Sequence, residues 1–134
     1  MVKIEAKYDG NLRCTATHLP SGNTLITDAP VDNNGKGESF SPTDLLATSM
    51  LTCIMTIVAI RAESKKLDVS EMSGSVEKIM AANPRRVARL EIVINLPGSL
   101  NNEDRAWLIS EGCNCPVCVS VSDSMEVDLT FNSV

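Results

Sequence analysis

The sequence contains few aromatic residues and a single histidine, and these scarcities exclude several functions. Aromatic residues make up 3% of the 134-residue chain, which argues against a surface that stacks nucleic-acid bases. The net charge is −5, whereas a protein that binds phosphate backbones needs a basic face. We therefore expect no nucleic-acid partner. The single histidine, His18, lies in an expected turn, so a hydrolase built on a Cys–His pair has little support.

The sequence shows no export signal. Residues 1–8 alternate apolar and charged side chains, whereas a signal peptide has an apolar core. Five cysteines in such a chain indicate a reducing compartment, where cysteines serve reactivity, metal binding or packing more often than structural disulfides. We expect a cytoplasmic protein. The length predicts one domain spanning residues 1–134, large enough to bury a core without crosslinks.

The most apolar stretch of the chain runs from Ser41 to Glu63. It opens with a helix start signal, since Ser41 can cap the helix, Pro42 suits its first position and Asp44 completes a capping box. The central part of the stretch carries no charge but is shorter than the roughly 20 apolar residues of a membrane span. The pattern predicts a helix buried on nearly all sides inside a soluble protein, with no membrane partner.

The remaining elements follow from alternation and turn residues. Strand patterns precede the helix, two longer ones follow it, and one closes the chain. The pairs Asp9-Gly10 and Asn83-Pro84 mark turns between neighbouring strands. Gly112 ends a second helix and Pro116 starts a short third one. The expected strands are 2–8, 12–17, 24–28, 69–81, 86–96 and 125–131, which together with the helices predict an α+β fold.

Two cysteines stand out by their places in these elements. Cys115 falls at or beside the N-cap of the third helix, where unpaired N–H groups and the helix dipole favour a thiolate. Cys53 lies in mid-helix among threonines and serines, and it needs a cation or hydrogen-bond donors because burial alone raises a thiol pKa. Together they allow a peroxidatic and resolving pair, in which one sulfur becomes a sulfenic acid and condenses with the other.

The remaining cysteines leave other interpretations open. Cys115 and Cys118 have the spacing of a thioredoxin-like motif, but no strand of a βαβ unit precedes them. Cys113, Cys115 and Cys118 could bind zinc together with Cys53, although the sequence lacks the second CxxC of a typical structural site. Cys14 lies in a strand and is expected to pack there.

At this point the chain resembles the OsmC/Ohr superfamily, which includes organic hydroperoxide resistance proteins and osmotically induced peroxidases. The resemblance rests on the phrase FSPTDLLATSMLTC at Phe40–Cys53 and on the later Cys-Pro-Val at Cys115–Val117. The segments TDAP at Thr27–Pro30 and GKGESFSP at Gly35–Pro42 are similar to the OsmC-like branch. The order of elements, β-β-β-α-β-β-α-α-β, agrees along essentially the whole chain.

The resemblance implies a fold and a chemistry. It implies antiparallel strands wrapped around a long central helix, in an interlocked homodimer with active sites at the subunit interface. It implies that Cys53 is the peroxidatic thiol and Cys115 the resolving thiol. We expect no cofactor and no metal. An apolar pocket of Leu46, Met50 and Ile54 would favour organic hydroperoxides, and a dithiol reductant would regenerate the enzyme.

The group that would activate Cys53 is less clearly marked. Family peroxidases carry a glutamate directly after the proline that starts the helix, and this chain has Thr43 there, followed by Asp44. Their activating arginine comes from the first strand connection or from the loop before the helix. The candidates for replacing this pair are Glu38, Asp44, Lys36 and Arg13.

The sequence thus predicts a thiol-dependent peroxidase, and two alternatives stay open. One is a non-enzymatic dimer that binds apolar ligands and retains the fold and thiols without the activating cation. The other is a zinc or redox-sensing protein that uses the cysteine cluster. The thiol pKa of Cys53 and the metal content of the purified protein discriminate among the three.

Overall fold

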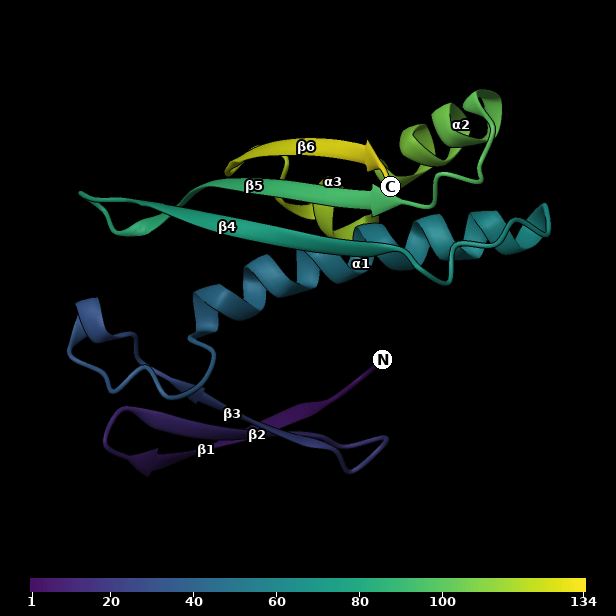
Figure 1. Cartoon of the computed structure of the whole chain (residues 1–134). Helices are drawn as coiled ribbons and strands as arrows, with labels where there is room; N and C mark the ends of the chain where they lie inside the picture. Colours follow the sequence, from purple (N-terminus) through teal and green to yellow (C-terminus); the bar gives the residue numbers. More distant parts are fainter. The chain divides into compact units, whose positions relative to one another are not determined.

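The computed structural model describes all 134 residues, which form two compact units, residues 1–46 and 47–134. Six strands and three α-helices follow one another in the predicted order, with one short 3-10 helix at Val31–Asn33. Each unit contains one three-stranded sheet (Figure 1). The α+β prediction is therefore confirmed.

The first unit is an antiparallel meander of strands β1 (Ile4–Gly10), β2 (Arg13–His18) and β3 (Thr24–Asp28). The prediction of a turn at Asp9-Gly10 was wrong by two residues. The turn falls on Asn11 and Leu12, both with positive φ (52° and 62°), as a type I′ turn requires. Gly10, with φ 86°, instead lies at a register shift that lengthens β1.

Helix α1 (Pro42–Ser64) begins with the predicted capping box. The Asp44 N–H donates to Ser41 Oγ at 3.0 Å, and the Ser41 N–H donates to Asp44 Oδ2 at 2.9 Å. Helix α1 has 23 residues, and its most apolar 18-residue window has a mean hydropathy of 1.9. It is therefore long and apolar enough to span a membrane, and the prediction that it is too short was wrong. The core helix of a soluble protein meets the same two criteria.

The prediction that α1 is buried on nearly all sides was also wrong for the single chain. Met50, Ile54, Val58 and Ala62 form a fully buried stripe, but only 28% of the most apolar window of the helix is buried. Ile60 on another face is 53% exposed. The stripe recurs every four residues because one side of the helix packs and the other stays open.

The second unit contains a mixed sheet of β4 (Ser73–Ala81), β5 (Arg86–Leu96) and β6 (Glu126–Ser133), with β5 in the centre. Strands β4 and β5 pair antiparallel, as predicted, although β4 begins four residues later than position 69. The prediction of antiparallel strands was wrong for β6, which pairs parallel to β5. The two helices between them carry the chain back to the start of β5, as a parallel connection requires.

The core of the second unit lies between this sheet and α1. Alternate residues of β5 are fully or almost fully buried and face the helix side, namely Leu90, Ile92, Ile94 and Leu96. The absence of a side chain at Gly74 lets β4 approach α1, because a Cβ there would lie 2.9 Å from Leu51 Cδ1. Figure 1 shows α1 running along the sheet.

Helices α2 (Asn102–Gly112) and α3 (Pro116–Val121) connect β5 to β6. Asn101 caps α2, because its side-chain oxygen accepts a hydrogen bond from the Asp104 N–H at 2.8 Å. Helix α2 is tied to the end of α1, where Lys65 Nζ lies 3.9 Å from the centre of the Trp107 ring and Arg61 pairs with Glu111 at 3.0 Å. The chain then turns into α3, and Cys115 is the residue directly before this helix.

Candidate active site

Cys115 occupies the N-cap of α3, as predicted. Its backbone is extended (φ −66°, ψ 148°), and its sulfur accepts a hydrogen bond from the Cys118 N–H at 3.2 Å. Pro116 follows as the first helical residue, which suits a ring without an N–H group. The Cys115 side chain is fully buried. The local sequence therefore fixes this thiol rigidly at the start of a helix, beneath the surface.

Cys53 projects from the middle of α1 toward the same place. The Cys115 thiol and the Val117 N–H both lie near enough to shift the pKa of the Cys53 thiol. Cys53 is half-buried and has not formed a disulfide. The structure thus brings together two thiols from separate helices, both within the second unit, and one of them is more accessible than the other.

The surroundings of Cys53 raise the pKa of its thiol. Burial is the largest cause, because it disfavours the charged thiolate, and the hydrogen bond and charge of Cys115 act in the same direction. The Val117 N–H opposes them by stabilising the thiolate. None of these groups is a cation, so their net effect is to keep Cys53 protonated at neutral pH.

Cys118 is a third thiol in contact with the pair. Its sulfur lies 2.8 Å from Cys115 Sγ and 3.1 Å from the thioether sulfur of Met50. Burial, followed by the nearby Cys115, raises the pKa of Cys118 to about 12. The sequence interpretation did not include Cys118 in the peroxidatic pair, although its CxxC spacing from Cys115 was the signal that could have done so.

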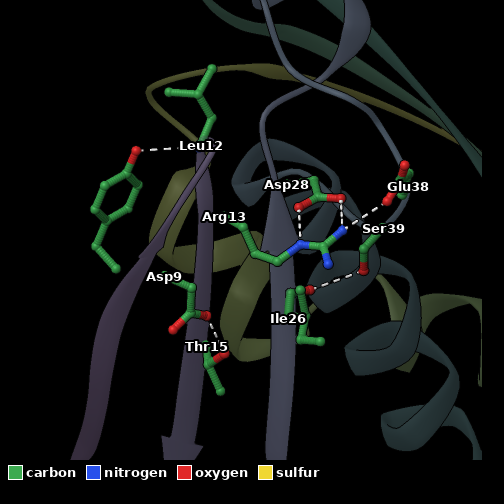
Figure 2. A network of polar contacts seen from close by, with 9 residues as sticks. Asp9, Leu12, Arg13, Thr15, Ile26, Asp28, Glu38 and Ser39 are labelled. Atoms are coloured by element: carbon green, nitrogen blue, oxygen red, sulfur yellow. Dashed lines mark hydrogen bonds and ion pairs between the residues drawn. The ribbon is translucent and has the colours of Figure 1, made fainter.

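Arg13 is the centre of an ion-pair network in the first unit (Figure 2). Its Nε and Nη2 donate to the two carboxylate oxygens of Asp28 at 2.7 and 2.8 Å, and Nη2 also reaches Glu38 at 3.1 Å. The hydrogen bond from Arg13 is the largest cause that lowers the pKa of Asp28. Asp28 was not among the candidate residues, yet it is 3% exposed and holds the arginine in a fixed orientation.

Comparison with known proteins identifies the family. The family model described as OsmC-like protein matches residues 35–130. The chain belongs to the OsmC-like family. A solved structure from Psychrobacter arcticus 273-4, of a protein assigned to the osmotic stress and detoxification response, is 41% identical, with 98% of this chain and 96% of that chain covered and a TM-score of 0.93.

More distant OsmC-like structures share the fold. The organic hydroperoxide resistance protein OsmC from Legionella pneumophila is 18% identical over 98% of this chain and 96% of that chain, with a TM-score of 0.76. An OsmC like protein from Mycoplasma pneumoniae is 13% identical over 100% and 97%, with a TM-score of 0.85. A comparison with curated proteins found no match.

The other candidate residues of this OsmC-like chain occupy different environments. Lys36 lines a cavity of about 280 Å³ together with Arg13, Asp9, Gly10 and Asn11. Asp44 is engaged in the capping box of α1. Such engagement fixes the orientation of the Asp44 carboxylate at the start of the helix.

The residues predicted to form the apolar pocket also differ in burial. Met50 and Ile54 are fully buried in the second unit, whereas Leu46 is half-buried at the end of the first. Of the three, Met50 contacts a thiol of the site, through the sulfur of Cys118.

The structure also bears on the zinc alternative and on the positions of Cys14 and His18. No group of three or more His, Cys, Asp or Glu side chains is arranged to hold a metal ion. Cys14 is half-buried in β2, consistent with packing. His18 ends β2, is exposed, and its Nδ1 lies 2.6 Å from Ser21 Oγ.

Proposed function

We propose that this OsmC-like protein is a cytoplasmic thiol-dependent peroxidase that reduces organic hydroperoxides through a cycle of Cys53 and Cys115. The observation that supports the proposal is the closeness of these two thiols, one from the middle of α1 and the other from the N-cap of α3. The Cys53 thiolate attacks the distal oxygen of the hydroperoxide, the O–O bond breaks, and the alkoxide leaves as the alcohol by taking the proton that the Cys53 thiol lost. The resulting sulfenic acid condenses with the Cys115 thiol to give a disulfide and water.

The assignment of roles rests on accessibility. Cys115 is fully buried, whereas Cys53 is half-buried, so a peroxide can reach Cys53 more readily. Cys115 can still act as the resolving thiol, because it needs to meet only the neighbouring sulfenic acid. An external dithiol then reduces the disulfide through a mixed-disulfide intermediate.

The choice of substrate class rests on the apolar surroundings and on the relatives. Met50 and Ile54 lie one turn or less from Cys53 on α1, and both are apolar. The Legionella pneumophila relative carries the name of an organic hydroperoxide resistance protein. An alkyl or aryl hydroperoxide is therefore a better candidate than hydrogen peroxide.

The open face of α1 supports a homodimer. Ile60 is 53% exposed there, and the first unit also exposes large apolar side chains, among them Ile4, Tyr8, Leu25 and Ile26. Exposed apolar surface of this kind is typical of protein interfaces. We propose that a second copy of the chain covers it, as the family resemblance implies.

One stoichiometric experiment tests the peroxidase assignment. The reduced protein is mixed with one equivalent of cumene hydroperoxide, and the products are followed by peroxide assay and intact mass. We expect the wild type to consume the peroxide and lose two hydrogens. Cys53→Ser should consume none, while the control Cys14→Ser, which removes a thiol from β2, should behave as wild type. Equal consumption by Cys53→Ser would eliminate the assignment.

A second candidate function is favoured by the raised pKa of Cys53. A thiol that stays protonated reacts slowly with peroxides, which suits a dimer that binds apolar ligands without catalysis. Titration of Cys53 by its alkylation rate, together with binding of a fluorescent fatty acid, separates the two. Peroxide consumption that rises with the thiolate fraction of Cys53 supports the peroxidase, and tight fatty-acid binding without peroxide consumption supports the alternative.

A further inference from the structure

Cys115 has two thiol neighbours, and they come from different elements. Cys53 lies near it from α1. Cys118 belongs to α3, and its sulfur lies 2.8 Å from the Cys115 sulfur. The Cys118 N–H also donates to the Cys115 sulfur at 3.2 Å, and this hydrogen bond holds the two residues close together. A disulfide that joins Cys53 to Cys115 therefore forms beside a third thiol that is already in contact with one of its sulfurs.

The three thiols differ in their access to solvent. Cys115 is fully buried, so an external reductant cannot attack its sulfur directly. Cys118 is half-buried and lines an open cavity of about 430 Å³ with mainly apolar walls. Among the other residues that line this cavity are Cys113, Val119, Met125, Val127 and Leu129.

We propose that Cys118 is a second resolving thiol, which moves the disulfide from Cys53–Cys115 to Cys115–Cys118 and presents it to the reductant in this cavity. The inference rests on the proposed peroxidase function. In the exchange, the Cys118 sulfur attacks Cys115 Sγ, the Cys53–Cys115 bond breaks, and Cys53 leaves as a thiolate that receives the proton lost by Cys118. No net oxidation occurs in this step, because one disulfide replaces another.

The next step returns the protein to its reduced state. A dithiol in the cavity attacks Cys118 Sγ, forms a mixed disulfide and releases Cys115. The second thiol of the reductant then closes its own disulfide and releases Cys118. In this scheme Cys53 is free to react with a second peroxide before any reductant arrives. The proposal therefore predicts how many equivalents of peroxide each chain consumes.

The positions of Lys and Arg allow the two disulfides to be distinguished by trypsin. Cleavage after Lys36 and Arg61 gives a peptide of residues 37–61, in which Cys53 is the one cysteine. No Lys or Arg follows Arg105, so the peptide of residues 106–134 carries Cys113, Cys115 and Cys118. A Cys53–Cys115 disulfide links these two peptides. A Cys115–Cys118 disulfide leaves the first peptide free and forms a loop within the second.

The test adds cumene hydroperoxide to reduced protein without reductant, blocks free thiols, and maps the peptides by mass spectrometry. For the wild type we expect the internal loop, consumption of about two equivalents of peroxide per chain, and a sulfenic acid on Cys53 that dimedone traps. For Cys118→Ser we expect linked peptides, about one equivalent consumed, and no dimedone adduct on Cys53. Cys14→Ser should match the wild type.

Three results would count against the proposal. If the linked peptides persist in the wild type and consumption stops near one equivalent, the exchange does not occur and the peroxidase cycle stands alone. If the wild type consumes no peroxide, both the exchange and the proposed function fail. If Cys118→Ala and Cys118→Ser both keep the wild-type thermal melt and still consume two equivalents, Cys118 has no role. The wild-type peptide map decides the matter even if both variants fail to fold.

Discussion

Arg13 and Asp28 lie directly opposite each other on β2 and β3 and form a bidentate ion pair. The Asp28 carboxylate is 3% exposed, while Glu38, the third member of the network, is exposed. A buried carboxylate that loses its charge leaves the guanidinium without its partner, whereas an exposed carboxylate is replaced by water. The network therefore has one structural member and one peripheral member.

We predict that Asp28→Asn lowers the melting temperature at neutral pH more than Glu38→Gln does. The folded-state pKa of Asp28 lies below its unfolded value of about 3.9, so its contribution is present above that pH and is lost as pH falls through the folded pKa. Calorimetry at pH 7 and near pH 2 measures this difference. The gap between wild type and Asp28→Asn should shrink in acid, and a gap that stays constant would contradict the ion-pair explanation.

The raised pKa of Cys53 predicts the pH dependence of its reaction with peroxide. The thiolate is the reactive form, so the rate follows the thiolate fraction, which grows about tenfold per pH unit below the pKa. Stopped-flow mixing with cumene hydroperoxide between pH 6 and pH 8 should therefore show a steady rise without a plateau. Cys14→Ser should give the same profile.

A plateau below pH 7 would mean that a cation lowers the pKa of Cys53 in the assembled protein. Arg13 is then the first candidate, because its ion pairs with Asp28 and Glu38 fix the guanidinium in place. Under that outcome Arg13→Gln should restore the rise with pH, and Arg13→Lys should restore part of it because lysine keeps the charge without the planar fork. Lys36→Gln tests the other candidate cation, which lines the same cavity as Arg13, and it should leave the plateau unchanged if Arg13 is the activating group.

The close approach of β4 and α1 makes Gly74 sensitive to substitution. A Cβ at this position would lie 2.9 Å from Leu51 Cδ1 and 3.0 Å from the Val93 carbonyl oxygen, and the backbone atom cannot rotate away. We predict that Gly74→Ala lowers the free energy of unfolding by about 1–3 kcal/mol. Urea denaturation measures it. Ser75→Ala, at the exposed neighbouring position, should change stability little, and similar losses for both would refute the packing argument.

The features that sequence alone predicted are those set by short-range interactions. Two such features are the capping box of Ser41 and Asp44 and the N-cap position of Cys115. Each depends on residues within three positions of each other, so a short stretch of sequence is enough to predict it. The β-β-β-α-β-β-α-α-β order follows from periodicity in the same way. The family resemblance added the pairing of Cys53 with Cys115, which no local pattern contains.

The features that sequence missed depend on register and on long-range pairing. The opposition of Arg13 and Asp28 requires the exact register of two short strands, and a shift of one residue would send one side chain to the other face. The parallel pairing of β6 depends on where α2 and α3 return the chain. The contact of Cys118 with Met50 joins α3 to α1 and has no counterpart in the spacing of either segment.

That contact gives the last prediction. Met50 is fully buried, and its thioether lies 3.1 Å from the Cys118 sulfur. If volume is what Met50 contributes, Met50→Leu should cost less than about 1.5 kcal/mol of unfolding free energy, because leucine nearly conserves the volume. Met50→Ala should cost about 2–5 kcal/mol, because it leaves a cavity.

Maleimide labelling of Cys118 measures how open the packing around this thiol is. The labelled residue is located by fragmentation of the peptide of residues 106–134, which also contains Cys113 and Cys115. The cavity in Met50→Ala should let the reagent reach Cys118 faster, whereas Met50→Leu should label at the wild-type rate, because the packing against Cys118 is kept. A loss of stability in Met50→Leu as large as in Met50→Ala would mean that the sulfur atom itself, and not the volume, holds Cys118 beside Cys115, since sulfur is the feature that leucine lacks.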